Sequence, residues 1–432
     1  MTQPTGAGPP QERPTRQGTT APTDAPRIAY LASEYPSVTS SFIRREIAEL
    51  RRRGLQIETM SIRRCRTPEA LGRHEQDAAR TTFVVLDAGV TGTIGALAWA
   101  LTRHPLRLFR AGIAALHHRP AGLRPLLWAG FYLAEACVLA RELERRGVGH
   151  LHNHFANAAA NVGFLTQRLL AAPWSLTLHG NADFEGEHRD LLRDKIAACV
   201  FVGCISHYGK AQALRRAALA DWDKVFVYGC GLDLAELERH RRAPVPGMVL
   251  CVGRLSAEKG QAGLLQAFAQ LRTSNARLRL VGDGPERGPL TRLTERLGLT
   301  DRVEMLGSLP TDQALGEMSR AQLLVLTSFM EGIPVVLMEA MALGLCVIAP
   351  RLAGIPELVE HRVNGVLFTP AHWTELAHTI DELLTDHALR ERLASAAQNG
   401  AGRRLSVEKA AAPLADCFVR RQFRVDAKPV RH

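Results

Sequence analysis

The sequence predicts an α/β protein of two domains, each built from alternating strands and helices. The chain has 432 residues, enough for two domains of about 200 residues that each bury a core. Its hydrophobic fraction of 46% and charged fraction of 22% are typical of globular proteins. A charged segment near the middle, broken by Pro244 and Pro246, is typical of an interdomain linker.

The elements of the first half can be placed in order. A β-prone run from Arg27 to Ala32 comes first, and a helical pattern from Phe42 to Arg53 follows and ends at Gly54. Further strands are expected at 55–62, 149–155, 175–184, 200–206 and 225–233, and the second half opens with a buried strand at 248–253. We therefore expect a disordered tail at 1–26, a first domain at 27–235, a linker at 236–247, a second domain at 248–402 and an amphipathic helix at 403–425.

One carboxylate stands in a long apolar stretch. The nineteen residues from Gly332 to Pro350 carry a single charge, Glu339. An ionised carboxylate inside such a stretch costs several kcal/mol unless a polar group meets it. Glu331 stands eight residues earlier, where Pro334 suits a helix start that attracts anions. Two acids beside an anion-binding helix start suit a ligand with phosphate and hydroxyls, such as a nucleotide sugar. The alternative is a buried glutamate that backbone amides satisfy.

Other motifs surround these two acids. They are Val-Gly-Arg-Leu-Ser-Ala-Glu-Lys-Gly at 252–260, Leu-Val-Gly-Asp-Gly-Pro at 280–285, Leu-Gly-Ser-Leu-Pro at 306–310, Ala-Gly-Ile-Pro-Glu-Leu-Val at 353–359 and Asn-Gly at 364–365. With the Glu-x7-Glu pair, this series resembles the retaining glycosyltransferases of the GT-B fold, in particular family 4, also called group 1. The resemblance implies two Rossmann-like domains that face a central cleft. It also implies that the first domain binds the acceptor, the second binds the nucleotide sugar, and the C-terminal helix returns to the first domain.

The resemblance implies roles for individual side chains. Glu331 would contact the sugar and Glu339 the ribose hydroxyls. Negative charge grows on the departing phosphate during the reaction, so positive groups must stabilise it. Arg254 and Lys259, five residues apart, can bind this phosphate together. By resemblance, His179 approaches the sugar and pyrophosphate, although a histidine satisfied within the core is the alternative. These four residues, Arg254, Lys259, Glu331 and His179, form the expected catalytic set. Further donor contacts are expected from Gly253, Gly307, Leu309, Gly332, Ile333, Pro334 and Val335. Neither a metal nor another cofactor is expected.

The acceptor side resembles the exopolysaccharide and colanic-acid branch of the family. The segments at 33–47 and 154–156 carry this likeness, although the branch usually has Ser-Glu-Thr at the position of Thr39, Ser40 and Ser41. Ser40 or Ser41 suits the N-cap of the first helix, which would direct backbone N–H groups at the cleft. The residues expected on the acceptor side are Ser40, Ser41, His154 and Asp183.

Three histidines alternate along one expected strand. His150, His152 and His154 would share one face, a geometry that can bind zinc or iron. We do not expect a metal there, because the sequence offers no nearby acid to complete the set. The segment Asp221-Trp222-Asp223 has the spacing of a metal-binding Asp-x-Asp, but its position before a strand argues against that role. The glycines at 282–288 do not have dinucleotide-loop spacing.

The net charge is +11, which indicates an anionic partner. Between Ala88 and Ala134 the chain has no acid, while five arginines alternate with Leu, Trp and Phe. Such a region can lie on an anionic membrane surface, with arginines at the headgroups. The alternative is a pair of packed helices with a solvated basic face. Nucleic acid is not expected, because no recognition motif accompanies the charge.

The location follows from the termini and the cysteines. No run of 18 uncharged apolar residues predicts a spanning helix, and the first 26 residues have no apolar core of a signal peptide. The eight cysteines form no Cys-x-x-Cys pair and are expected to be buried thiols. We expect a cytoplasmic protein, at the inner face of the cell membrane if the basic region binds lipid.

The resemblance implies a hexosyltransferase-type enzyme of polysaccharide or glycoconjugate biosynthesis. It would move a sugar from a nucleotide-sugar donor to a hydroxyl of a glycan, lipid-linked or other small acceptor, with retention of anomeric configuration. Two alternatives stay open: a GT-B nucleotide-sugar 2-epimerase, and a non-catalytic partner subunit that binds nucleotide sugar. The motif from Glu331 to Glu339 disfavours the first, and the joint presence of all the expected site residues disfavours the second.

Overall fold

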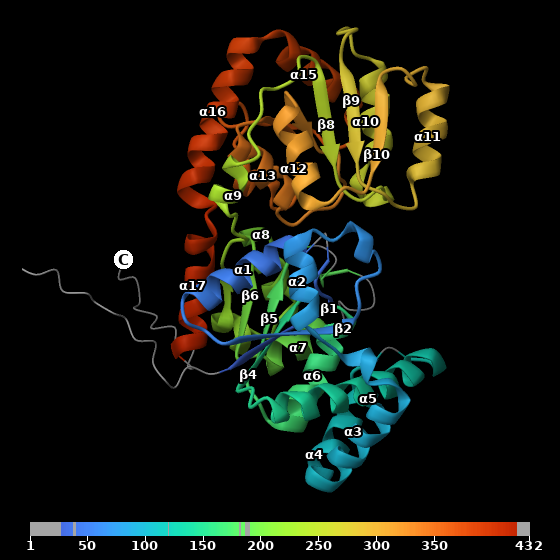
Figure 1. Ribbon diagram of the computed structural model, residues 1–432, viewed down its shortest axis with the longest axis vertical. Coiled ribbons are helices and arrows are strands. Elements are labelled where there is room, and N and C mark those ends of the chain that lie inside the picture. Colours follow the sequence, from blue (N-terminus) through green and yellow to red (C-terminus); the bar gives the residue numbers. More distant parts are fainter. Residues whose placement is uncertain (1–26, 38–39, 120, 181–182, 186–190, 421–432) are drawn as a thin grey trace, which may run out of the picture.

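Two parallel sheets, each covered by helices on both faces, make up the chain (Figure 1). The computed structural model describes residues 27–37, 40–119, 121–180, 183–185 and 191–420. The sheet of the first domain has the order β3-β2-β1-β4-β5-β6-β7, and that of the second has the order β10-β9-β8-β11-β12-β13. This confirms the prediction of two Rossmann-like α/β domains. The tail expected at 1–26, and residues 421–425 of the expected C-terminal helix, lie outside the described residues.

The first domain contains the following elements. They are β1 Ile28–Glu34, α1 Ser41–Arg52, β2 Ile57–Arg63, α2 Arg73–Thr81, β3 Phe83–Val84, α3 Gly89–Arg103, α4 Pro105–His117, α5 Leu123–Arg145, β4 His150–His154, α6 Ala158–Leu170, β5 Trp174–Leu178, α7 Leu192–Ala198, β6 Phe201–Cys204, α8 His207–Arg216 and β7 Val225–Val227. One face of the sheet packs on α5, α6 and α7, and the other packs on α1.

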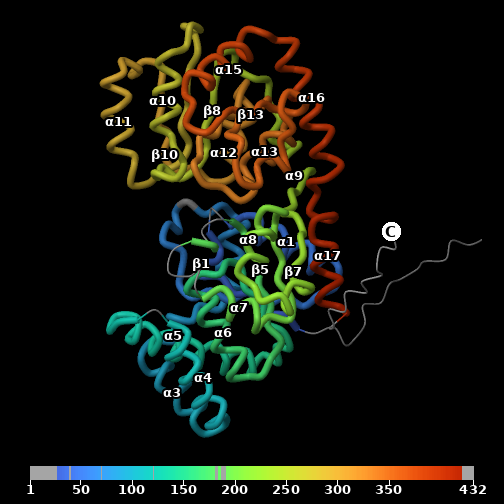
Figure 2. Tube along the Cα trace, turned by 180° about the vertical axis from the view of Figure 1, so that it is seen from behind, coloured from blue at the N-terminus to red at the C-terminus, as the bar shows by residue number. Residues whose placement is uncertain are grey.

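The linker and the second domain follow. They contain α9 Leu234–Glu238, β8 Met248–Val252, α10 Gln261–Ala269, β9 Arg277–Val281, α11 Arg287–Arg296, β10 Val303–Gly307, α12 Thr311–Arg320, β11 Leu323–Val325, α13 Val335–Leu343, β12 Cys346–Pro350, α14 Ile355–Leu358, β13 Val366–Phe368, α15 Trp373–Thr385 and α16 His387–Arg404. The last helix, α17 Val407–Arg420, packs on α1 of the first domain, and α16 and α17 together run along one side of both domains (Figures 1 and 2).

Two expected strands are shorter than the sequence pattern predicts. The run 175–184 leaves the sheet after Leu178, because the Asp183 carboxylate accepts N–H groups from His179 and Gly180 and holds a turn there. The run 225–233 ends at Val227. At Gly231 the chain passes so close to α17 that an added Cβ would lie 2.3 Å from the Val407 Cα.

Helices α3, α4 and the first half of α5 project from the first domain at the end far from the second domain (Figures 1 and 2). We call residues 89–132 the helical lobe. Its interior is made of small side chains, which let the helices pack closely: Ala96, Ala100, Ala111, Ala115 and Ala129. Two segments, Val85–Arg103 and Leu123–Arg145, are long and apolar enough to cross a membrane. In the most apolar 18 residues of each, 17% and 33% are buried within the protein. The second half of α5 forms part of the core of the first domain.

Candidate functional site

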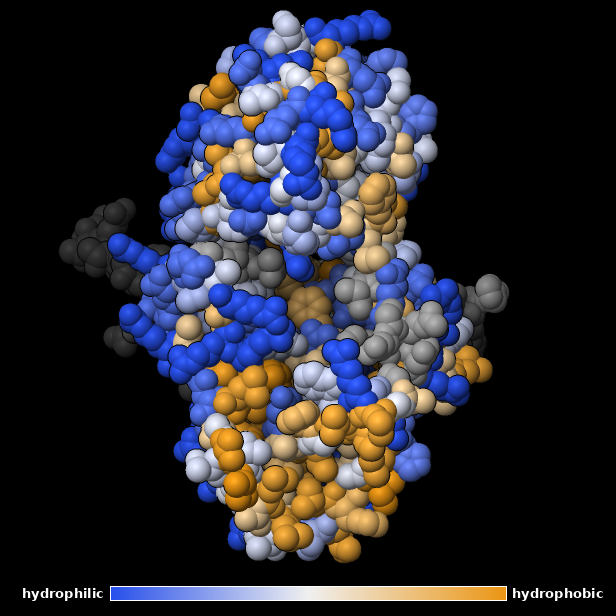
Figure 3. Space-filling model, turned by 90° about the vertical axis from the view of Figure 1, so that its right-hand side faces the viewer, coloured by the Kyte–Doolittle hydropathy of each residue, from blue (hydrophilic) through white to orange (hydrophobic). Residues whose placement is uncertain are grey.

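The site lies where the two sheets face each other at the carboxyl ends of their strands. In the first sheet the strand order reverses between β1 and β4, and in the second it reverses between β8 and β11. Ligands of open parallel sheets bind in the crevice at such a switch point. Each domain turns its crevice toward the other, and Figure 3 shows a recess at the waist between them.

A lysine and a glutamate meet at the switch point of the second domain. Lys259 ends a short turn after β8, and Glu331 lies in the loop after β11. The Lys259 Nζ lies 2.7 Å from the Glu331 Oε1, which also accepts a hydrogen bond from the Ser328 hydroxyl. The two loops are joined by a hydrogen bond from the Thr327 hydroxyl to the Lys259 carbonyl. The structure therefore brings together two of the predicted catalytic residues.

The polar partner required by Glu339 comes from the other domain. Glu339 lies on α13, and its Oε1 accepts a hydrogen bond of 2.8 Å from the Arg45 Nη2 on α1. Arg45 is buried, with 2% of its side chain exposed, and the Glu236 carboxylate lies 4.0 Å from its Nε. The expectation of a polar partner is confirmed, but the partner is a side chain and not the backbone amides of the alternative. Arg45 was not singled out from the sequence, where it stands 294 residues before Glu339.

The His179 loop touches the loop before α13. A Cβ added at Gly332 would lie 2.0 Å from the His179 carbonyl oxygen, and one added at Gly180 would lie 3.1 Å from the Gly332 nitrogen. Glycine is therefore needed for the close approach of the two domains here. The Asp183 carboxylate holds this loop, because it accepts N–H groups from Ala156, His179 and Gly180. Its burial raises its pKa, and these three hydrogen bonds oppose that shift.

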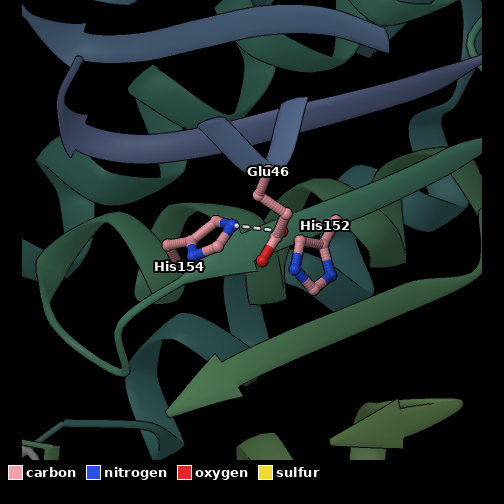
Figure 4. A group of neighbouring side chains, drawn as sticks. All are labelled: Glu46, His152 and His154. Atoms are coloured by element: carbon pink, nitrogen blue, oxygen red, sulfur yellow. Dashed lines mark ion pairs between the residues drawn. The ribbon is translucent and has the colours of Figure 1, made fainter. Parts of the chain in front are cut away.

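A buried network of polar side chains supports His179. The His154 Nδ1 lies 2.8 Å from the His179 Nε2, and the His154 Nε2 lies 3.4 Å from the Glu46 Oε1 (Figure 4). Glu46 also accepts a hydrogen bond from the Tyr30 hydroxyl. Burial and the neighbouring His154 hold the pKa of His179 well below 6.5, so this imidazole is neutral near pH 7. The contact with His154 thus fixes the orientation of the His179 ring. This suits a histidine that donates or accepts one hydrogen bond at the cleft.

The expectation that no acid stands near the histidines of β4 is wrong, because Glu46 of α1 lies beside two of them, and Glu46, His152 and His154 are close enough to be tested as metal ligands. Their ligand atoms all lie within 4.8 Å of one another. However, His152 has a hydroxyl at each ring nitrogen, Ser175 at 2.7 Å and Thr177 at 3.1 Å. Hydrogen bonds thus account for the orientation of His152, and burial lowers its pKa well below 6.5. As expected from the strand alternation, the three histidines of β4 share one face, where His150 and His152 both contact Ser175.

The other predicted site residues take the following places. Ser40 stands at the N-cap of α1, but its hydroxyl donates to the Ser37 carbonyl and makes no capping bond, while Ser41 opens the helix. Arg254 is exposed in the loop after β8. The helix α13 starts one residue later than Pro334, which occupies its N-cap. Of the remaining donor-side residues, Val335 is the first residue of α13 and Gly307 the last of β10, while the others lie in loops after strands of the second sheet: Gly253, Leu309, Gly332 and Ile333. Their roles stay predictions.

These two domains, with their switch points facing each other, define a protein of the GT-B class. The sequence of the second domain agrees, since residues 236–400 match the family described as "Glycosyl transferases group 1".

Individual proteins similar to this chain include glycosyltransferases. The chain is 26% identical over 319 residues to an alpha-D-kanosaminyltransferase of Streptomyces kanamyceticus. The match covers 64% of this chain and 79% of that protein. It is 36% identical over 156 residues to the putative colanic acid biosynthesis glycosyltransferase WcaL of Salmonella typhimurium, a match over 34% of this chain and 38% of WcaL. Among solved structures, HepE of Anabaena in complex with UDP-glucose is similar, with a TM-score of 0.69, 20% identity and coverage of 91% and 99% of the two chains. The last likeness supports the fold.

Proposed function

We propose that this protein is a nucleotide-sugar-dependent glycosyltransferase that transfers a hexosyl unit to a hydroxyl group with retention of configuration. The observation that carries the proposal is the pairing of Lys259 with Glu331 at the switch point, where the loop after Glu331 touches the His179 loop of the first domain. A cation can bind the diphosphate, a carboxylate can accept hydrogen bonds from sugar hydroxyls, and a neutral imidazole can donate or accept one hydrogen bond. The match of the second domain to the group 1 glycosyltransferases supports this choice over the epimerase and the non-catalytic subunit.

In the proposed mechanism, the donor enters between Lys259 and Glu331 and exchanges their direct contact for contacts to itself. Lys259 and Arg254 would meet the charge that grows on the departing diphosphate, together with the N–H groups at the start of α13. Glu331 would then hold sugar hydroxyls, and Glu339 the ribose. The departing phosphate would take the proton of the acceptor hydroxyl on the same face of the sugar.

The test measures release of nucleoside diphosphate from a panel of UDP-, GDP- and ADP-sugars, with and without EDTA. Release from one donor that persists in EDTA would support a metal-independent transferase and name its donor. Loss of release in EDTA would refute the metal-independent mechanism. Appearance of the 2-epimer of the donor sugar, without transfer, would favour the epimerase instead. If no donor is turned over and no nucleotide binds, the transferase proposal fails.

We also propose that the helical lobe lies on an anionic membrane. Apolar side chains on the outer face of α4 recur at helical spacing, Leu106, Phe109, Ile113 and Leu116, and the first two are 73% and 69% exposed. Similar outward positions occur on α3 and α5, and Figure 3 shows the resulting apolar surface at the lower end of the molecule. Five arginines and no acid stand between Ala88 and Ala134, which suits anionic headgroups. A colanic-acid-type acceptor would be presented at such a surface.

Sedimentation with vesicles of phosphatidylglycerol tests this contact. The double variant Leu106→Ser and Phe109→Ser should lose vesicle binding, because it removes two large apolar side chains from the outer face. Leu219→Ser is the matched control, since Leu219 is 76% exposed outside the lobe. Equal sedimentation of the double variant and the wild type would refute the membrane contact.

A further inference from the structure

A cavity of about 320 Å³ lies where the helical lobe joins the first domain. Its wall comes from the ends of α4 and α7 and from α5 and α6, and its volume is at the lower end of the range of small-molecule sites, about 300–1,000 Å³. The helix α6 begins directly after the cleft end of β4, so the part of the wall formed by α6 lies near the acceptor side of the first domain. None of its lining residues belongs to the site described above.

Two buried acceptor atoms line this cavity. The Asn161 Oδ1 and the His118 Nε2 have no hydrogen-bond partner among the residues that the structure describes, and these side chains are 6% and 8% exposed. The His118 Nδ1 lies 3.4 Å from the Asp194 carboxylate. Burial and the nearby Lys195 hold the pKa of His118 at about 4, so the neutral ring keeps its hydrogen on Nδ1 and offers Nε2 as an acceptor. A buried acceptor without a partner is costly, and two ligand hydroxyls, one donating to each atom, would satisfy both.

The rest of the lining has a different chemistry. Arg119 and Arg124 bring two guanidinium groups, whose planar donors suit a phosphate. Trp128 and Tyr132 bring aromatic faces, against which the apolar face of a sugar ring can pack. Trp128 also belongs to the exposed apolar surface of the lobe, so the cavity opens at the edge of the proposed membrane contact.

We infer that this cavity binds a sugar phosphate carried by a lipid, with the sugar hydroxyls on Asn161 and His118, the phosphate on the two arginines and the lipid chain along the outer face of the lobe. The inference deepens the proposed function and rests on it, because it names the acceptor as a lipid-linked sugar phosphate. Binding to the cavity is nevertheless measurable without turnover.

The experiment measures binding of three probes to the full chain by calorimetry: decyl glucosyl phosphate, glucose 1-phosphate and inorganic phosphate. We expect decyl glucosyl phosphate to bind most tightly and inorganic phosphate least. Arg124→Ser and Trp128→Ala should each weaken binding of decyl glucosyl phosphate by about tenfold or more. Trp222→Ala is the matched control, because Trp222 is 44% exposed and Trp128 is 46% exposed.

Each further outcome has a defined meaning. Unchanged binding by both cavity variants would overturn the inference. If inorganic phosphate binds as tightly as decyl glucosyl phosphate, the cavity is a simple anion site and the inference is overturned as well. If glucose 1-phosphate binds as tightly, the ligand is a free sugar phosphate and the lipid-borne ligand is overturned. Nucleoside diphosphate binding, which the cleft performs, should be the same in all variants and reports that they are folded. If the nucleotide does not bind while the glycolipid does, the proposed transferase fails and the cavity stands.

Discussion

The change of Glu339 to Gln separates the two roles that this carboxylate has in our proposal. The variant keeps the shape of the side chain but removes the charge that Arg45 meets at 2.8 Å and that we propose for the ribose hydroxyls. A hydrogen bond to a charged group is worth about 1.5–3 kcal/mol. Loss of the ribose contact should therefore weaken nucleoside diphosphate binding by roughly 10- to 150-fold.

Calorimetric titration with the nucleoside diphosphate of the preferred donor measures this effect. The variant Arg45→Met tells whether Glu339 acts through the ribose or through its ion pair with Arg45. Arg45→Met breaks the same ion pair but leaves the Glu339 carboxylate available, so its affinity should stay within a few-fold of the wild type. Glu382→Gln is the control, because Glu382 pairs with Arg362 at 2.7 Å elsewhere in the second domain. If Glu339→Gln binds as the wild type does, the ribose role is wrong. If both cleft variants lose affinity equally, Glu339 acts by joining the domains.

Three further predictions follow from the site. Lys259→Ala should lower kcat by about 10²- to 10³-fold with little change in KM, because it removes charge stabilisation of the departing diphosphate, as steady-state kinetics will test; unchanged kcat would exclude that role. Gly332→Ala should open the cleft and raise the radius of gyration in X-ray scattering, while Gly316→Ala in α12, where an added Cβ meets nothing within 4 Å, should not; equal radii would contradict the close approach. Burial lowers the pKa of His118 and of His150 to about 4 from 6.5, so the unfolded chain takes up protons first and the free energy of unfolding should be highest above pH 6.5 and fall toward pH 4. Urea unfolding across this range measures it, and a flat profile would show that these rings are not buried as neutral groups.

Local patterns were sufficient for much of the fold. The strand after the tail, the first helix and the opening strand of the second domain lie within a few residues of their predicted places, since each has a clear period and a glycine or proline boundary. The run 175–184 is shortened by a local turn, in which the Asp183 carboxylate accepts N–H groups from His179 and Gly180. The run 225–233 is followed by the close approach of Gly231 to α17, a contact with a distant part of the chain.

The site was only partly predictable. Sequence motifs indicated Lys259, Glu331 and Glu339, and the absence of other charges around Glu339 required a partner. The identity of Arg45 depends on how the two domains face each other, which no local spacing contains. The contact between His154 and His179 likewise follows from the pairing of β4 with β5.

The helical lobe shows another limit of sequence patterns. Its arginines and large apolar residues were visible in the sequence, but the pattern did not tell which face is buried. The structure places alanines inside and Leu, Phe and Ile outside, the reverse of an ordinary packed helix. Composition indicated the special character of this region, and only the packing revealed its orientation.

The chain crosses between the domains twice, and the two crossings are tied together. The Leu232 N–H donates to the Leu405 carbonyl at 2.7 Å, and the Val407 N–H donates to the Leu232 carbonyl at 2.9 Å. Two crossings that are bonded side by side restrict the relative motion of the domains more than a single connection would. We therefore expect the cleft to open by a hinge motion about Leu232 and Leu405, in which the His179 loop and the loop that holds Gly332 separate and meet again. The double crossing should limit the ways in which the domains can move apart, so that each closure restores the same contact between His179 and Gly332.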